Sequence, residues 1–265
     1  NRTSPFAFTG NKFEFRAVGS SQSIAPVNIA LNAAVACALD DIATQLEAAV
    51  SAGTPLNQAL QEFLPREFKE HSPVVFNGNG YSNTWPKEAE RRGLPNLSNT
   101  VDALEHYSDP DVMNVFLRHG ILSEREILSR QEILLDTYAK DIEIEGATLL
   151  DLVRGKVLPP CRAAQAQACD LVLKTKKAGI EPDEEMKNLQ TIRSHVTSME
   201  KAVGQLEEAI AKVKGIEGTL ERAKGARDQI LPLMGKIRED SDALEAIVDD
   251  KLWELPKYSE LLWVH

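Results

Sequence analysis

The sequence predicts a mainly α-helical protein, a helical bundle with long antiparallel helices, preceded by a short piece of β-strand and helix. Three observations support this prediction. Beyond residue 25 the apolar positions repeat at helical spacing, prolines and glycines stand where helices begin and end, and a convincing strand pattern occurs only at residues 12–18. Hydrophobic residues make up 43% of the 265, which is enough to form a buried core.

The predicted strand lies near the N-terminus, from Lys12 to Val18. Apolar and charged residues alternate there, so that Lys12, Glu14 and Arg16 share one face. A single strand cannot satisfy its own backbone groups or cover its edges. We therefore expect its pairing partners to lie in preceding sequence or in another chain.

Two helices and a loop are predicted next. Pro26 suits the first turn of a helix that runs to Gly53, and Thr54-Pro55 begins a shorter helix that ends near Pro65. Residues 71–100 read as a loop with one short helix at 86–92. The two Asn-Gly pairs at 77–80 predict tight turns more strongly than a backbone cradle for phosphate.

The remaining sequence predicts long helices. Ser123 and Glu126 form a capping box, and a further helix follows Pro159-Pro160 and ends at Gly179. Apolar residues then recur in steps of three and four, at Leu189, Ile192, Val196, Met199, Val203, Leu206, Ile210 and Val213. Because apolar return helices follow a turn at 215–218, we expect an intramolecular hairpin core rather than a dimerising zipper.

Composition narrows the functional classes. The net charge of −10 argues against a nucleic-acid binder, which needs a basic patch. No run of about eighteen residues is free of polar ones, so we expect no membrane-spanning helix. Three cysteines without a CxxC pair indicate a reducing, cytoplasm-like compartment, and Cys161 and Cys169 are predicted to be buried thiols. The five histidines show no metal-ligand spacing.

The charged strand face is the candidate for chemistry. A carboxylate between two cations, as Glu14 is between Lys12 and Arg16, stays ionised and suits a hard cation such as Mg²⁺. Arg16 and Arg2 are able to clamp a carboxylate or phosphate. The competing interpretation is a solvated strand face whose ion pairs contribute under about 1 kcal/mol each. Spacing alone favours that second interpretation.

A family resemblance changes this weighting. Asn1-Arg2-Thr3-Ser4 and Lys12-Phe13-Glu14-Phe15-Arg16, followed by a Ser-rich turn and an Ala-rich helix, resemble the closing motif of the glutamine synthetase catalytic domain. Residues 6–16 together with Gly19-Ser20-Ser21-Gln22-Ser23 are similar to type III glutamine synthetases. Further similarities occur at Phe76–Ser82, Lys87–Leu94, Ser123-Glu124, Ser129–Ile133 and Leu252–Leu262, so the resemblance covers nearly the whole chain.

The resemblance implies ATP-dependent joining of ammonia to glutamate through a γ-glutamyl phosphate, with Mg²⁺ (or Mn²⁺) ions. By motif position, Glu14 would be a metal ligand on the nucleotide side, and Arg16 would bind glutamate and the transferring phosphoryl group. Arg2 would contact the ATP phosphates and the γ-glutamyl phosphate, and Lys12 would stand near the nucleotide. Lys12 stands where many relatives outside type III carry arginine.

The resemblance also implies an organisation. Residues 1–70 would be the end of the catalytic α+β domain, including its short strand and helix remnant, and residues 71–265 a type III C-terminal helical domain. The family's other metal ligands, ATP loop and ammonia-site aspartate precede the Asn1 motif, so we expect the C-terminal part of a longer enzyme that is inactive by itself. The family forms homo-oligomeric rings, dodecamers among them, and we expect a cytoplasmic location, with a plastid as the alternative.

A second interpretation assigns the chain to another class: a stand-alone helical interaction or assembly module whose N-terminal charges are merely exposed. Metal-ligand motifs encoded upstream would favour the ligase. Independent folding and partner binding by residues 71–265, without an encoded catalytic portion, would favour the module.

Overall fold

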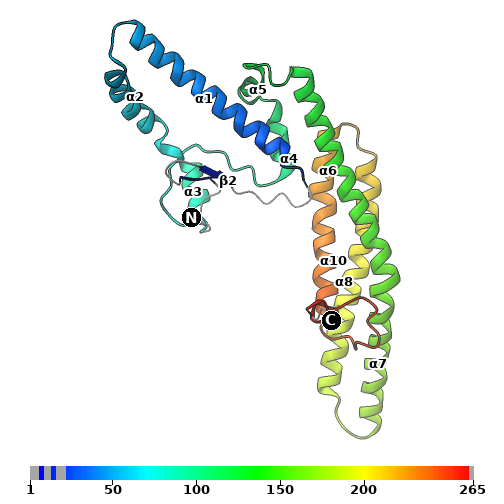
Figure 1. Ribbon diagram of the computed structural model, residues 1–265. Helices are drawn as coiled ribbons and strands as arrows, with labels where there is room; N and C mark the ends of the chain where they lie inside the picture. The colour runs from blue at the N-terminus through cyan, green and yellow to red at the C-terminus, as the bar shows by residue number, and fades with distance from the viewer. Residues whose placement is uncertain (1–5, 9–12, 16–21, 81, 263–265) are drawn as a thin grey trace. The chain divides into compact units, whose positions relative to one another are not determined.

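The computed structural model describes residues 6–8, 13–15, 22–80 and 82–262 (Figure 1). The chain divides into two compact units, Asn1–Gln131 and Glu132–His265, and each is described by itself below. Both units consist mainly of helices, which confirms the predicted mainly α class.

The first unit begins with two short strands, β1 (Phe6–Phe8) and β2 (Phe13–Phe15). They pair in antiparallel register, with Ala7 opposite Glu14. β2 occupies the middle of the strand predicted at 12–18. The expectation that its pairing partners lie outside the chain is wrong for β1, because the Phe-Ala-Phe stretch is close enough in sequence to fold back onto β2.

Helices make up the rest of the first unit. They are α1 (Ala25–Ser51), α2 (Leu56–Glu70), the 3₁₀ turn η1 (Ser72–Val74), α3 (Thr84–Arg91), α4 (Thr100–Glu105), the 3₁₀ turn η2 (His106–Ser108), α5 (Pro110–Leu117) and the first turns of α6 (Glu124–Leu152). A small core joins α1, α5 and α6 through the buried side chains of Ala33, Phe116, Leu122 and Ile127. Residues 71–100 are mostly irregular around α3, as the sequence predicts.

Helix α2 continues past Pro65 to Glu70, so the predicted end near Pro65 is wrong. A proline inside a helix removes one hydrogen bond and crowds the preceding turn. Here the helix is held on both sides of the proline, because Phe63 is buried and Arg66 donates a hydrogen bond to Gln45 of α1. Tertiary contacts along α1 therefore offset the local penalty.

Helix α1 corrects the expectation about membranes. Among the described residues it is the one helix long and apolar enough to span a bilayer by length and composition, with a mean hydropathy of 1.3 over its most apolar stretch. The expectation failed because scattered polar residues such as Asn28 and Asn32 do not outweigh the Ala, Val, Leu and Ile around them. One such helix is weak support for a membrane span, because core helices pass the same test.

The capping box predicted at the start of α6 is present. The backbone N–H and the hydroxyl of Ser123 both donate to the Glu126 carboxylate, at 2.8 and 2.7 Å, and the Glu126 N–H donates to the Ser123 hydroxyl at 3.4 Å. These hydrogen bonds lower the pKa of Glu126 and satisfy donors that the first helical turn leaves open.

Helix α6 does not stop before Pro159-Pro160, where the sequence predicts a new helix. It passes through a π-helical turn, η3 (Val153–Val157), directly into α7 (Leu158–Lys177). A second π-helical turn, η4 (Ala226–Ile230), joins α9 (Thr219–Gly225) to α10 (Leu231–Glu245), again just before a proline, Pro232. A proline has no N–H and cannot bond the carbonyl four residues before it, which would disrupt a regular α-helix. In a π-helical turn the hydrogen bonds join residues five apart, and this change of spacing allows the helix to continue into the proline.

The core of the second unit is built on α8 (Asp183–Lys214), which packs against both α7 and α10 (Figure 1). The heptad positions are buried from Ile192 to Val213, whereas Leu189 is only half-buried. This confirms the intramolecular hairpin core. The short helix α11 (Tyr258–Leu261) follows near the C-terminus.

Two helical glycines give a matched test of this packing. Gly204→Ala in α8 is expected to stabilise the protein by about 0.5–1 kcal/mol, because a Cβ there meets nothing within 4 Å and alanine favours helix. Gly146→Ala in α6 is expected to destabilise it, because its Cβ would lie 3.0 Å from Ile210 Cδ1 and 3.3 Å from Ile230 Cγ2, and overpacking costs about 1–3 kcal/mol. Urea denaturation followed by circular dichroism compares the two; equal midpoints would contradict the packing of α6 on Ile210 and Ile230.

Candidate functional site

The predicted site lies mostly outside the described residues. Arg2, Lys12 and Arg16 are not among them, and for Glu14 the structure describes only the backbone, in β2 opposite Ala7. The assignment of the four residues to catalysis, nucleotide binding and metal binding therefore stays a prediction. Within the described part of the chain, His, Cys, Asp and Glu side chains form no group of three or more that could hold a metal ion.

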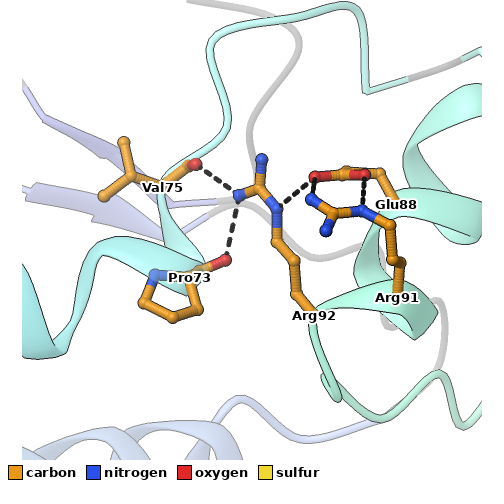
Figure 2. A network of polar contacts seen from close by, with 5 residues as sticks. All are labelled: Pro73, Val75, Glu88, Arg91 and Arg92. Atoms are coloured by element: carbon orange, nitrogen blue, oxygen red, sulfur yellow. Dashed lines mark hydrogen bonds and ion pairs between the residues drawn. The ribbon is translucent and has the colours of Figure 1, made fainter.

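A charged cluster in the first unit is well defined (Figure 2). Arg91 donates from Nε and Nη2 to both oxygens of Glu88, at 2.7 and 2.6 Å, and Arg92 donates from Nε to the same carboxylate at 2.6 Å. Arg92 Nη1 also donates to the carbonyl oxygens of Pro73 at 3.0 Å and Val75 at 2.8 Å. The cluster thus ties the C-terminal end of α3 to η1 and to the residue that follows it.

The sequence makes this cluster by helical spacing. Glu88 lies three and four residues before Arg91 and Arg92, so all three share one side of α3. Hydrogen bonds from Arg91 and then Arg92 lower the pKa of Glu88 to about 2, so its carboxylate is ionised at neutral pH. In the sequence these residues stand out only as part of the stretch that resembles type III glutamine synthetases. Their spacing indicates the ion pairs, but no local pattern indicates the carbonyl partners of Arg92.

Two aromatic side chains, Phe76 and Trp85, pack beside this cluster. The Trp85 ring stacks on Phe76, with centroids 4.2 Å apart, and the Arg92 guanidinium lies 5.6 Å from the Trp85 ring. At Gly78 a Cβ would come within 2.4 Å of the Phe76 ring. Glycine is therefore required there for the ring to take this position.

Two pairs of polar side chains in the second unit, each with a buried carboxylate, have structural roles. Arg222 of α9 forms a bidentate pair with Glu143 of α6, both hydrogen bonds being 2.7 Å long. His195 of α8 contacts Asp240 of α10 through Nδ1 and Oδ1 at 2.9 Å, and Lys236 Nζ lies 3.5 Å from the same oxygen. Each pair joins two helices of the bundle.

Asp240 leads to a pH prediction. Burial by itself raises its pKa, but the hydrogen bond from His195, the nearby hydroxyl of Ser198 and the charge of Lys236 outweigh burial, so the pKa is below its usual value. A lowered acid pKa stabilises the fold above the unfolded-state pKa, and that contribution is lost as pH falls through the folded-state value. Asp240→Asn is therefore expected to cost about 1–3 kcal/mol at neutral pH and much less in strong acid. Urea midpoints at both pH values test this, and an equal loss in acid would contradict the charge as the cause.

The cysteines are only partly as predicted. Cys161 is buried, and burial raises the pKa of its thiol to about 11. Cys169 is exposed, which corrects the prediction of a buried thiol. Eight residues exceed two helical turns by enough to rotate the second thiol out of the core.

Comparisons with known proteins show which family the chain resembles. Residues 59–176 match the model of the glutamine synthetase C-terminal domain. The whole chain is 40% identical to a type-3 glutamine synthetase of Dictyostelium discoideum, and 99% of it is 34% identical to a glutamine synthetase of Bacteroides fragilis and 35% identical to one of Butyrivibrio fibrisolvens. The chain is therefore similar to glutamine synthetases over nearly its whole length.

The relative from Dictyostelium discoideum is named as a type-3 enzyme. The chain spans about 37% of the length of each of these relatives. The predicted domain boundary between residues 70 and 71 lies inside the matched stretch, and the two compact units meet elsewhere, at Gln131. That boundary stays a prediction.

Proposed function

We propose that the chain is part of a type-3 glutamine synthetase that joins ammonia to glutamate at the expense of ATP. The observation that carries the proposal is similarity over the entire chain to enzymes of that name, 40% identical in one case. The N-terminal residues Arg2, Lys12, Glu14 and Arg16 stand in the motif that the resemblance assigns to the active site.

Glu14 is proposed as a metal ligand. Residues two apart on a strand share a face, and Glu14 lies in β2, so the flanking charges at 12 and 16 are expected on its side of the hairpin. Two cations keep a carboxylate ionised, and an ionised carboxylate is the ligand type that Mg²⁺ or Mn²⁺ prefers. When bound, such ions neutralise charge on phosphate oxygens.

The basic residues are proposed to hold the anionic substrates. Arg16 would orient glutamate so that its γ-carboxylate attacks the terminal phosphorus of ATP, and ADP leaves. Arg16 would also bind the transferring phosphoryl group. Arg2 would contact the ATP phosphates and then the γ-glutamyl phosphate, while ammonia attacks the γ-carbonyl carbon, phosphate leaves and a proton is lost. Lys12 would contact the nucleotide. Fixed cations at these positions accelerate phosphoryl transfer because negative charge on the transferring group is stabilised without reorganisation.

The rest of the chain is proposed to support this site. Residues 1–70 would end the catalytic domain, with the β1–β2 hairpin and α1 as its strand and helix remnant, and residues 71–265 would be the family-specific helical domain. We further propose a homo-oligomeric ring, a dodecamer by family resemblance, in the cytoplasm. Light scattering of the full-length enzyme measures the assembly.

Activity of the full-length protein tests the proposal. With ATP, Mg²⁺, glutamate and ammonia, it is expected to release glutamine and phosphate in equal amounts, and neither product without ammonia. The 265 residues alone are expected to form no glutamine, because the chain spans only about 37% of the length of the glutamine synthetases that it resembles. Folded, assembled full-length protein without activity would overturn the proposal and favour the stand-alone interaction module. Glutamine formation by the 265 residues alone would overturn the expected inactivity.

A further inference from the structure

We propose that Arg91 and Arg92, with Glu88 between them, form a binding site for a small oxyanion, either a phosphate or a carboxylate group. The two arginines line an open cavity of about 380 Å³ together with Ser72, Pro73 and Val75. None of these residues belongs to the N-terminal motif, and the inference does not depend on the proposed ligase activity.

Arg92 is the fixed part of the site. Three acceptors hold its guanidinium group: the Glu88 carboxylate and the carbonyl oxygens of Pro73 and Val75 (Figure 2). The side chain is 23% exposed, and the Trp85 ring lies beside it. These contacts engage Nε and Nη1, and Nη2 has no partner among the residues that the structure describes. A guanidinium held in place loses little further conformational entropy when it binds a ligand.

Arg91 is the accessible part of the site. Its side chain is 71% exposed, and Nε and Nη2 are both directed to Glu88, which leaves Nη1 without a partner in the described part of the chain. Both arginines therefore contribute an unused donor group. Oxyanions such as phosphate and carboxylate match guanidinium donors in geometry and charge.

The charge of the cluster favours an anion. Two guanidinium groups share one carboxylate, which leaves a net charge of one positive unit in a chain whose net charge is −10. Glu88 remains ionised at neutral pH, so this balance does not change in the physiological range. One surplus charge and a cavity of this size suit a single small anionic group rather than a polyanion.

The test measures Arg91 itself in the full-length protein, so that phosphate bound elsewhere in the enzyme does not contribute to the signal. An arginine-specific dicarbonyl reagent is applied at constant ionic strength in chloride, inorganic phosphate or acetate, and the rate of modification at each arginine is measured by mass spectrometry. We expect phosphate or acetate to slow the modification of Arg91 severalfold relative to chloride. The two salts distinguish the two oxyanion classes. Arg125, which is exposed on α6, is the matched control and is expected to react equally in all three salts.

Two variants sharpen the test. Arg92→Gln is expected to abolish the protection of Arg91, because it removes the fixed half of the site. Glu88→Gln raises the local charge by one unit and is expected to strengthen the protection. Equal rates at Arg91 in all three salts, or equal protection of Arg91 and Arg125, would overturn the proposal. Protection that survives Arg92→Gln and weakens in Glu88→Gln would also overturn it.

Discussion

Glu14→Gln in the full-length enzyme is expected to lower glutamine formation at least about 100-fold and to move the Mg²⁺ dependence to higher concentration. The substitution keeps the size of the side chain and removes the charge of the proposed ligand. Loss of supporting residues around a metal already costs 10–100-fold in many enzymes, so loss of a direct ligand costs at least as much. The measurement is the initial rate of glutamine formation over a Mg²⁺ titration.

A matched substitution controls for general charge effects. Glu208→Gln removes the same charge from an exposed position of α8 and is expected to leave both the rate and the Mg²⁺ dependence unchanged. Light scattering checks that both variants assemble as the unmodified enzyme does. Wild-type activity of the Glu14 variant at low Mg²⁺ would remove Glu14 from the proposed site without affecting the family assignment.

Glu143→Ala is expected to be the most destabilising of the proposed substitutions, by about 3–5 kcal/mol, because it leaves a partly buried guanidinium without its partner. The side chain of Glu143 is 5% exposed and that of Arg222 is 23% exposed. Arginine keeps its proton in proteins, so Arg222 cannot escape the penalty by becoming neutral. Of the carboxylates that the structure describes beside it, Asp136 remains, with Oδ1 3.8 Å from Arg222 Nη1. Urea denaturation followed by circular dichroism gives the change in the free energy of unfolding.

Two comparisons separate burial from charge. Glu207→Ala breaks the Arg154–Glu207 pair, whose side chains are 46% and 59% exposed, and is expected to cost much less, because solvent screens an exposed ion pair. The double substitution Glu143→Leu with Arg222→Met is expected to recover most of the loss, since an apolar pair can replace a buried ion pair. Similar losses for Glu143→Ala and Glu207→Ala would show that the pair is not desolvated as the structure indicates.

Much of the helical architecture follows from local patterns. The capping box at Ser123 and Glu126, the buried heptad run from Ile192 to Val213 and the short helix near 86–92 were all predictable, because each depends on residues a few positions apart. The resemblance to glutamine synthetases was likewise recognisable in the sequence, and the comparisons confirm that resemblance.

Other features depend on contacts between distant residues. Whether Pro65 ends α2 was decided by the packing of α2 on α1, and whether Pro159 starts a new helix was decided by the π turn before it. In each case the local preference is worth a few kcal/mol at most, and tertiary packing of similar size can reverse it.

The sequence by itself determined the mainly α class and the resemblance to glutamine synthetases, because both depend on residue identity and short-range spacing. The roles proposed for Glu14 and its neighbours depend on that resemblance and stay a prediction. Only the tertiary structure decided where the charges of the helical part meet. The carbonyl oxygens of Pro73 and Val75 reach Arg92, and Glu143 reaches Arg222 across 79 positions of sequence, through folding alone. Ion-pair partners and cavities arise from long-range geometry, which no local pattern encodes.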